Sequence, residues 1–257
     1  MPKSGEPEPG LAAIGAVILA AGSGRRIGTP KLRLEAAGRS YLELILDRLG
    51  EAEIAPVVCI VSADQAEWAG PRLAAARRLD DPQPEGAPGR RQAAASSLLS
   101  NLQPAEAPGR QQAAASSLLS NPQPEEAPDR PCAAEWSLLV NPHPALGMFS
   151  SVQIGVKALQ ACRGLFIIPV DHPFVMLPTY LQLKQAFQHH PDAVIKPAFQ
   201  GRPGHPIVLP HFTFAAVLTA QPGTCLREVL LSVHMRRITL AVNDKGILRN
   251  INEPGDR

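Results

Sequence analysis

The sequence predicts an α/β fold with a mainly parallel sheet and helices on both faces. The first observation behind this prediction is that apolar strand candidates alternate with helical segments along most of the chain. The second is that the strand candidates at 16–21 and 165–170 are continuously apolar, which is typical of strands buried on both faces of a parallel sheet. The third is size, because 257 residues, 45% of them hydrophobic and 19% charged, suffice for one domain with a substantial core.

The chain opens with a polar segment rich in proline and glycine at residues 1–10, which we expect to be a disordered lead-in. A strand at 16–21, a glycine-rich loop through Pro30, an amphipathic helix from Ser40 and an apolar strand from Pro56 follow in that order. The apolar run around the first strand is too short to span a bilayer. It is also preceded by acidic residues, unlike the apolar part of a signal peptide.

Three 20-residue repeats, which begin at residues 82, 102 and 122, interrupt this alternation. Each copy offers little more than a Leu-Leu pair and a few alanines to bury, and it contains several prolines, so a stacked repeat domain is disfavoured. The third copy alone carries Trp136, which indicates that the first two are duplications in a surface loop. Because loop-closure entropy grows slowly with length, we predict a single domain over 11–257, interrupted by a mobile tandem-repeat insertion at about 80–130.

After the repeats the alternation of strands and helices resumes. The pattern predicts strands at 136–141, 165–170, 193–199, 205–210 and 237–242, and helices at 150–161, 179–189, 212–220 and 224–232, with a turn at 243–246. Strands that alternate with helices in this way favour crossover connections and hence a mainly parallel sheet.

Charge and cysteine usage narrow the possible partners. The net charge of +2 is small, and nucleic-acid or membrane surfaces usually present clustered Lys and Arg, so we expect neither partner. The four cysteines are far apart and form no CxxC pair, which argues against a zinc site or a disulfide scaffold. Buried thiols in a reducing compartment, and hence a cytoplasmic location, are the expectation.

The strongest motif is LAAGSGRRIGTPK at residues 19–31, directly after the first strand and before a helix. Open α/β sheets bind ligands at this position. Three glycines allow sharp turns that point N–H groups inward, and three cations add positive charge, which together suit a polyphosphate. These residues are Gly22, Gly24, Gly28, Arg25, Arg26 and Lys31. The plainer interpretation is a glycine-rich surface turn with solvated cations.

Two better-known phosphate loops fit this motif poorly. A P-loop is excluded because no GK[ST] follows at the required spacing. A dinucleotide fingerprint needs G-x-G-x-x-G, whereas Gly22, Gly24 and Gly28 are spaced one residue too long. An NAD-dependent oxidoreductase is therefore disfavoured.

A second motif, PVDHP at 169–173, places Asp171 at the carboxyl end of an apolar strand. That position faces the same ligand crevice as the glycine loop. Carboxylate oxygens and substrate phosphates are what Mg²⁺ prefers, so Asp171 is a candidate magnesium ligand. The alternative is a carboxylate that caps the following turn.

Taken with two further segments, these motifs resemble the nucleotidyltransferases that act on the molybdenum cofactor and related phosphorylated substrates. The segment at 19–31 is similar to that family's loop LAAGxGxRMGxPK, with Ile27 in place of Met. NPHPALGMFSSVQIGVKAL, PVDHP and GRPGHPIVLP are similar to its next three blocks. The resemblance covers roughly 14–80 and 132–256 and implies the three-layer, Rossmann-like sheet of the nucleotidyltransferase type.

Carried over position by position, the resemblance implies a role for each of the following residues. The nucleotide would be bound by Leu19, Ala20, Ala21, Gly22, Ser23, Gly24, Arg26, Lys31, Ser150 and Ser151. Lys31, Arg26 and Asp171 would be catalytic, and Gly204 and His205 would line the acceptor side. On its own, a histidine such as His205 is more often a hydrogen-bonded structural residue.

The closing block departs from the family, because the chain has NINEPGD where the family reads like DIDTPED. Asn250 and Asn252 replace aspartates. An Asn oxygen can still ligate magnesium, so we predict Asn250 as a second metal ligand with a weakened contact.

The resemblance implies a Mg²⁺-dependent enzyme that joins a nucleotide to a phosphorylated acceptor and releases pyrophosphate. Ala21 in LAAG is similar to the cytidylyl-transferring branch rather than to the guanylyl branch, which reads LAGG, so CTP is the expected donor. Molybdenum cofactor is the expected acceptor, and a sugar 1-phosphate fits the same chemistry. A degenerate binding protein that serves a molybdoenzyme client is the alternative that Asn250 and the repeats favour.

Overall fold

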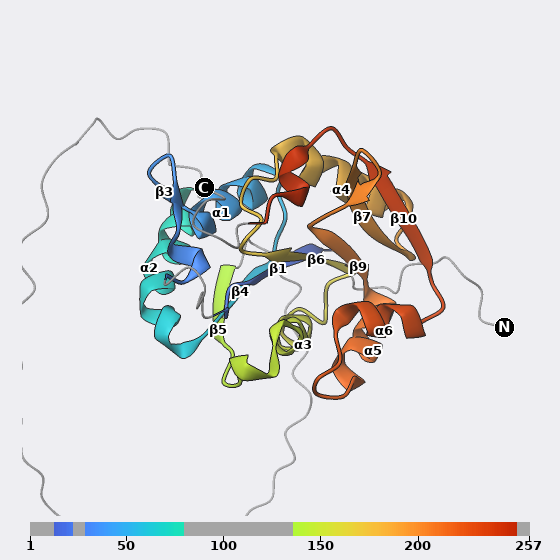
Figure 1. The fold of residues 1–257 in the computed structure, drawn as a ribbon, viewed down its shortest axis with the longest axis horizontal. Helices are drawn as coiled ribbons and strands as arrows, with labels where there is room; N and C mark the ends of the chain where they lie inside the picture. The colour runs from blue at the N-terminus through green and yellow to red at the C-terminus, as the bar shows by residue number, and fades with distance from the viewer. Residues whose placement is uncertain (1–12, 23–28, 80–135, 251–257) are drawn as a thin grey trace, which may run out of the picture. The chain divides into compact units, whose positions relative to one another are not determined.

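A computed structural model of the chain describes residues 13–22, 29–79 and 136–250. The predicted lead-in at 1–10 and the predicted repeat insertion at about 80–130 lie outside these residues. In the described part, an α/β fold has one large sheet at its centre (Figure 1). The predicted fold class is confirmed.

The large sheet has eight strands in the order β10-β7-β9-β6-β1-β4-β5, with β8 paired to β7. Its strands are β1 (Ile14–Leu19), β4 (Val57–Val61), β5 (Trp136–Val140), β6 (Gly164–Pro169), β7 (Ala193–Phe199), β8 (Arg202–Pro203), β9 (Ile207–Pro210) and β10 (Arg236–Ala241). A separate small hairpin joins β2 (Glu35–Ala36) to β3 (Arg39–Ser40).

Most neighbours in the large sheet are parallel. β1 pairs in parallel with β4 and β6, β4 with β5, and β10 with β7. β9 runs antiparallel to both β6 and β7. The sheet is therefore mainly but not wholly parallel, as the sequence predicts, and the carboxyl ends of β1, β4, β5, β6 and β7 share one edge.

Helices cover both faces of this sheet and complete three layers (Figure 1). The helices are α1 (Tyr41–Glu51), α2 (Ala63–Leu79), α3 (Met148–Ala158), α4 (Leu177–His189), α5 (Phe214–Thr219) and α6 (Leu226–Ser232), and the 3-10 turns are η1 (Lys31–Arg33), η2 (Pro144–Leu146), η3 (His211–Thr213) and η4 (Lys245–Leu248).

Alternate residues of β1 divide the core into two clusters. Ala16 and Ile18 pack in one cluster with side chains from α1, α2 and α4. Val17 and Leu19 pack in the other with side chains from α3, α5 and α6. Successive strand residues point to opposite faces, so an apolar run such as IGAVIL is what burial on both faces requires.

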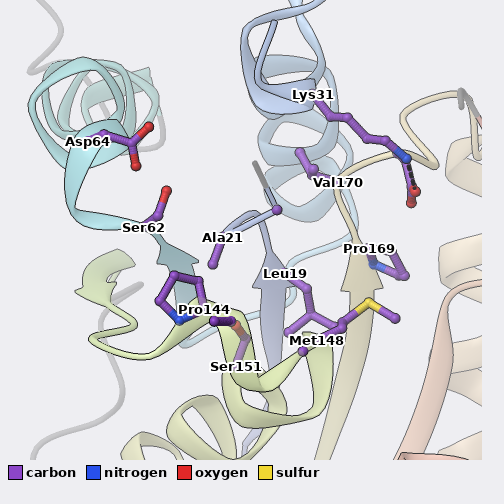
Figure 2. A pocket seen from close by; sticks show the side chains of 14 residues that line it. Leu19, Ala21, Lys31, Ser62, Asp64, Pro144, Met148, Ser151, Pro169 and Val170 are labelled. Carbon is purple, nitrogen blue, oxygen red and sulfur yellow. Dashed lines mark hydrogen bonds and ion pairs between the residues drawn. The ribbon is translucent and has the colours of Figure 1, made fainter. Parts of the chain in front are cut away.

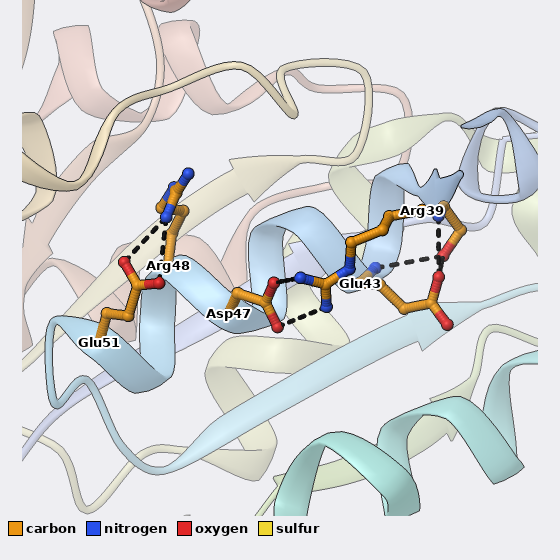
Figure 3. A network of polar contacts seen from close by, with 6 residues as sticks. Arg39, Glu43, Asp47, Arg48 and Glu51 are labelled. Carbon is orange, nitrogen blue, oxygen red and sulfur yellow. Dashed lines mark hydrogen bonds and ion pairs between the residues drawn. The ribbon is translucent and has the colours of Figure 1, made fainter. Parts of the chain in front are cut away.

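The first helix shows how local sequence sets an element's start. Ser40 accepts a hydrogen bond from the Glu43 backbone N–H, while the Glu43 carboxylate accepts one from the Ser40 backbone N–H, which together form a capping box (Figure 3). Arg39–Asp47 and Arg48–Glu51 pairs lie on the exposed side of the same helix (Figure 3). α1 therefore begins directly after β3 and anchors the segment that follows the glycine loop.

The sequence analysis did not predict α2, which follows β4 directly. Its sequence is dominated by alanine and charged residues and contains Pro71 inside the helix, so its apolar stripe is weak. Ala69 and Leu73 are nevertheless buried in the core. α3 and α4 both begin two residues earlier than predicted, at Met148 and Leu177.

Within the described residues, none of the helices combines the length and the apolar character that crossing a membrane requires.

Candidate active site

A cavity of about 590 Å³ lies where the parallel strands end. Figure 2 shows its side chains, which come from the ends of β1, β4 and β6, from η1 and η2, and from the starts of α2 and α3. Its described lining residues are Leu19, Ala21, Gly22, Lys31, Ser62, Asp64, Pro144, Ala145, Gly147, Met148, Ser151, Pro169, Val170 and Asp171. The volume lies within the roughly 300–1,000 Å³ range of small-molecule sites.

An ion pair joins two segments of this cavity that are 140 residues apart in the chain. Lys31 Nζ donates a hydrogen bond to Asp171 Oδ2 over 2.7 Å. Both side chains are largely but not fully buried, with 22% and 17% of their surface exposed. The pair places a cation and a carboxylate at the edge where open α/β sheets bind ligands.

The other oxygen of Asp171, Oδ1, is buried and has no hydrogen-bond partner among the described residues. His172 Nε2 is the nearest ring nitrogen of an adjacent side chain, at 3.8 Å. Burial lowers the pKa of His172, and the charge of Lys31 lowers it too, although Asp171 opposes the shift. The lowered pKa favours the uncharged form of this imidazole beside Oδ1.

His205 lies against His172, with ring centroids 4.9 Å apart. Burial lowers the pKa of His205 to about 4, and His172 adds to the shift while Asp171 opposes it. Among the described residues, the Lys31 ammonium and the His172 ring therefore lie beside the Asp171 carboxylate, and His205 packs against His172.

A divalent cation fits this arrangement. Asp171 Oδ1 is a buried anionic oxygen with unused acceptor capacity, and hard cations prefer such oxygens. Among the described residues, no group of three or more His, Cys, Asp or Glu side chains could hold a metal ion. Magnesium is commonly held by one or two carboxylates plus substrate phosphates rather than by an all-protein cage, and a lone Asp171 matches that mode.

Buried Asn141 organises the segment between β5 and α3. Its Nδ2 donates hydrogen bonds to Ser150 Oγ and Ser151 Oγ at 2.8 and 2.9 Å, and its Oδ1 accepts one from the His143 backbone N–H at 2.8 Å. Its own backbone N–H donates to Val61 O in β4. All side-chain donors and the acceptor of this amide are used, so Asn141 fixes the wall of the cavity that carries Ser151.

Gly147 ends that segment and precedes α3 with φ 89° and ψ 176°. This backbone region is essentially restricted to glycine. Gly147 therefore allows the chain to turn so that the first turn of α3 faces the cavity. A helix N-terminus of this kind favours anions.

A second cavity, of about 560 Å³, adjoins the first. The two share four lining residues, namely Leu19, Gly147, Met148 and Pro169. Predicted acceptor residues Gly204 and His205 both line the second cavity. Gly204 lies so close to η4 that a Cβ there would approach Ile247 O to 2.3 Å, which excludes a side chain at this position.

The structure brings six of the predicted site residues together in one cavity. Leu19, Ala21, Gly22, Lys31, Ser151 and Asp171 line the first cavity. Three other predicted residues, Ala20, Ser150 and Asn250, line neither cavity. Ala20 is buried and its backbone N–H donates a hydrogen bond to Ile60 O. Ser150 Oγ accepts a hydrogen bond from Asn141 and donates one to Gly147 O, and Asn250 is exposed. Ser23, Gly24, Arg26 and Asn252 lie outside the described residues.

Several lining residues were not predicted. Ser62 and Asp64 follow β4 at the same sheet edge as Asp171, so the rule that identified Asp171 would also have identified them. Lys196 and Arg227 line the second cavity. A single lysine inside the apolar strand AVIKPAF was the available signal for Lys196, whereas Arg227 gave none.

The model of one protein family, described as the MobA-like NTP transferase domain, matches residues 16–109 and 109–237. The chain belongs to this family. Membership confirms the resemblance that the glycine loop and the PVDHP motif carry, and it makes the chain a member of a nucleotidyltransferase family. No curated protein sequence matches the chain.

Solved structures share the fold. Rv0371c from Mycobacterium tuberculosis H37Rv is 16% identical with a TM-score of 0.60, over 96% of this chain and 95% of that one. The structure of its complex with manganese is 15% identical with a TM-score of 0.57, over 95% of this chain and 96% of that one. A nucleotidyl transferase from Methanothermobacter thermautotroptrophicus is 15% identical with a TM-score of 0.61, over 95% and 94%. The 4-diphosphocytidyl-2C-methyl-D-erythritolsynthase from Anaerococcus prevotii is 13% identical with a TM-score of 0.60, over 95% and 94%. At these identities the likeness concerns the fold alone.

Proposed function

We propose that the chain transfers CMP from CTP to a phosphorylated acceptor, the molybdenum cofactor, and releases pyrophosphate. The observation that carries the proposal is the Lys31–Asp171 pair. It lies in a cavity of suitable size for a nucleotide, directly beside a second cavity that contains Gly204 and His205. Two adjoining cavities are what a reaction between two separate substrates requires.

In the proposed reaction an oxygen of the acceptor phosphate attacks the α-phosphorus of the nucleotide. A new P–O bond forms there, and the bond between the α-phosphorus and the bridging oxygen to the β-phosphate breaks, so pyrophosphate leaves with that electron pair. No covalent enzyme intermediate is needed. The chain's contribution is to align two anions that repel one another and to neutralise the charge of the transition state.

Lys31 supplies positive charge in the first cavity, and Arg26 and the remaining glycine-loop residues are proposed to add N–H groups and a second cation. Asp171 is proposed as the magnesium ligand, with Asn250 as a weaker second one. When bound, the cation would neutralise phosphate charge. Asp171 Oδ1 supports this assignment because it is buried without a hydrogen-bond partner among the described residues, and the manganese complex of Rv0371c shows that a similar fold holds a divalent cation.

CTP as the donor rests on Ala21, which lines the first cavity and matches the alanine of the cytidylyl-transferring branch. The similar synthase from Anaerococcus prevotii, whose name includes a diphosphocytidyl group, is consistent with it. The molybdenum cofactor as acceptor rests on the family. A cytoplasmic location is proposed because Cys59 is a buried free thiol, as is usual in reducing compartments. A molybdoenzyme would then be the client of the product.

Pyrophosphate release from each of the four nucleoside triphosphates, with magnesium and molybdenum cofactor, tests the proposal. We expect CTP-selective release that Asp171→Ala abolishes. Asp192→Ala is the matched control, because Asp192 is an exposed residue that lines neither cavity. Selective pyrophosphate release with GTP would identify GTP rather than CTP as the nucleotide donor. Tight CTP binding without any release of pyrophosphate would favour the degenerate binding protein.

A further inference from the structure

Lys196 is an unusual residue for its position in the fold. It lies within the otherwise apolar strand β7, is only half-buried, and lines the second cavity. It forms no hydrogen bond or ion pair with any described residue. An anionic ligand in this cavity would supply the counter-charge that Lys196 lacks among the described residues.

Arg227 lines the same cavity from α6. It too forms no hydrogen bond or ion pair with a described residue. Lys196 on β7 and Arg227 on α6 are 31 residues apart along the chain. Their convergence on one cavity therefore comes from the fold and not from local sequence.

The remaining lining of this cavity is mostly apolar and contains no carboxylate among the described residues. Arg227 is exposed and Lys196 is half-buried, so both cations are accessible to an incoming ligand, and the apolar lining beside them strengthens a charge–charge attraction. Two cations without a carboxylate therefore make an electrostatically incomplete site.

We infer that Lys196 and Arg227 form an anion-binding site that holds the phosphate group of the acceptor. The inference rests on the proposed function for the identity of the ligand, a phosphate monoester, but the site itself follows from charge and geometry. The planar guanidinium of Arg227 suits two phosphate oxygens at once, and Lys196 adds a point charge.

The position of this site agrees with the proposed chemistry. Met148 and Gly147 line both cavities, so a phosphate held by Lys196 and Arg227 lies in the cavity that directly adjoins the one with Lys31 and Asp171. His205 lines the same cavity as Lys196 and Arg227, and its ring packs against His172, the residue that follows Asp171. The site thus places the acceptor anion apart from the cations that hold the nucleotide.

Cys225 provides a local reporter of this site. It is an exposed free thiol that lines the second cavity but not the first, whereas Cys59 and Cys162 are buried. The rate at which iodoacetamide alkylates Cys225 can be followed by peptide mass spectrometry, with and without inorganic phosphate. Sodium chloride at matched ionic strength controls for screening.

We expect phosphate to slow alkylation of Cys225 in the native chain. In Lys196→Met and in Arg227→Met, the phosphate concentration for half-protection should rise about tenfold or more, the effect of losing roughly 1.4 kcal/mol of binding. Lys196→Arg should retain protection because it keeps the charge. Lys157→Met is the matched control, since Lys157 is exposed on α3 and lines neither cavity.

Protection that is absent in the native chain, or unchanged in Lys196→Met, would overturn the inference. Steady-state kinetics separates it from the proposed function. If Lys196-dependent protection occurs but no pyrophosphate is released, the anion site stands and the proposed function fails. If pyrophosphate is released and Lys196→Met raises the KM for the acceptor without changing the KM for CTP, both stand.

Discussion

Lys31 Nζ and Asp171 Oδ2 lie 2.7 Å apart and connect the segment after the glycine loop to the end of β6. The hydrogen bond uses one carboxylate oxygen and leaves Oδ1 without a partner among the described residues. Asp171 can therefore keep Lys31 in place and still offer an anionic oxygen to a cation. Both groups that the proposed reaction needs in the first cavity are thus positioned before any substrate binds.

Replacing Lys31 by Met should lower kcat/KM for CTP by about 100-fold or more, because a charge aimed at the transition state is lost. Asp171→Asn should lower activity and weaken the dependence on magnesium, since a neutral amide attracts the cation less. Initial rates of pyrophosphate release over a magnesium titration measure both effects. Lys157→Met should retain the native rate, and a Lys31→Met variant as active as that control would contradict the role of Lys31.

Much of the fold and part of the site follow from local sequence. Asp171 was predicted because a continuous apolar run ends just before it, and the carboxyl ends of parallel strands meet at one edge. The same reasoning placed Lys31 near Asp171, although 140 residues separate them. Position relative to a strand end is a local property, which explains why it can be predicted from one sequence.

The second cavity could not be predicted in the same way. Lys196 and Arg227 lie on β7 and α6, and their convergence depends on how α6 packs against the sheet. Asn141 likewise gave no signal, because its role depends on the return of the chain to Ser150 and Ser151. α2 was not predicted because Pro71 and a weak apolar stripe hide a helix that tertiary packing stabilises.

Replacing Asn141 by Ala should destabilise the fold by about 1–3 kcal/mol, because its partners, including the His143 N–H, lose a buried hydrogen bond. The KM for the nucleotide should rise, since Ser151 and the adjacent wall of the first cavity are no longer held. Urea unfolding and nucleotide titration measure the two effects. Asn243→Ala is the control, because Asn243 is exposed and lines neither cavity. Equal stability of both variants would argue against Asn141 as an organising residue.

Replacing Gly147 by Ala should cost about 1–3 kcal/mol of stability, because φ 89° with ψ 176° is strained for any residue with a Cβ. Space is not the reason, since no atom lies within 4 Å of a Cβ built there. Gly70→Ala is a matched control inside α2, also with nothing within 4 Å. Alanine is favoured over glycine in a helix by roughly 0.5–1 kcal/mol, so this variant should be as stable as the native chain or more so. Thermal unfolding distinguishes the two, and equal melting temperatures would count against strain at Gly147.

Acidification should destabilise the fold through His205. Burial lowers its pKa from 6.5 to about 4 in the folded chain, so between these values the unfolded chain binds a proton that the folded chain does not. The free energy of unfolding therefore falls as pH drops from 6.5 towards 4 and is unaffected by this group above 6.5. The effect is on the order of 2 kcal/mol. Urea unfolding of the native chain and of His205→Gln at several pH values measures this effect. The free energy of unfolding of the variant should fall less steeply between pH 6.5 and 4. An identical pH dependence in both proteins would show that a buried neutral His205 is not responsible.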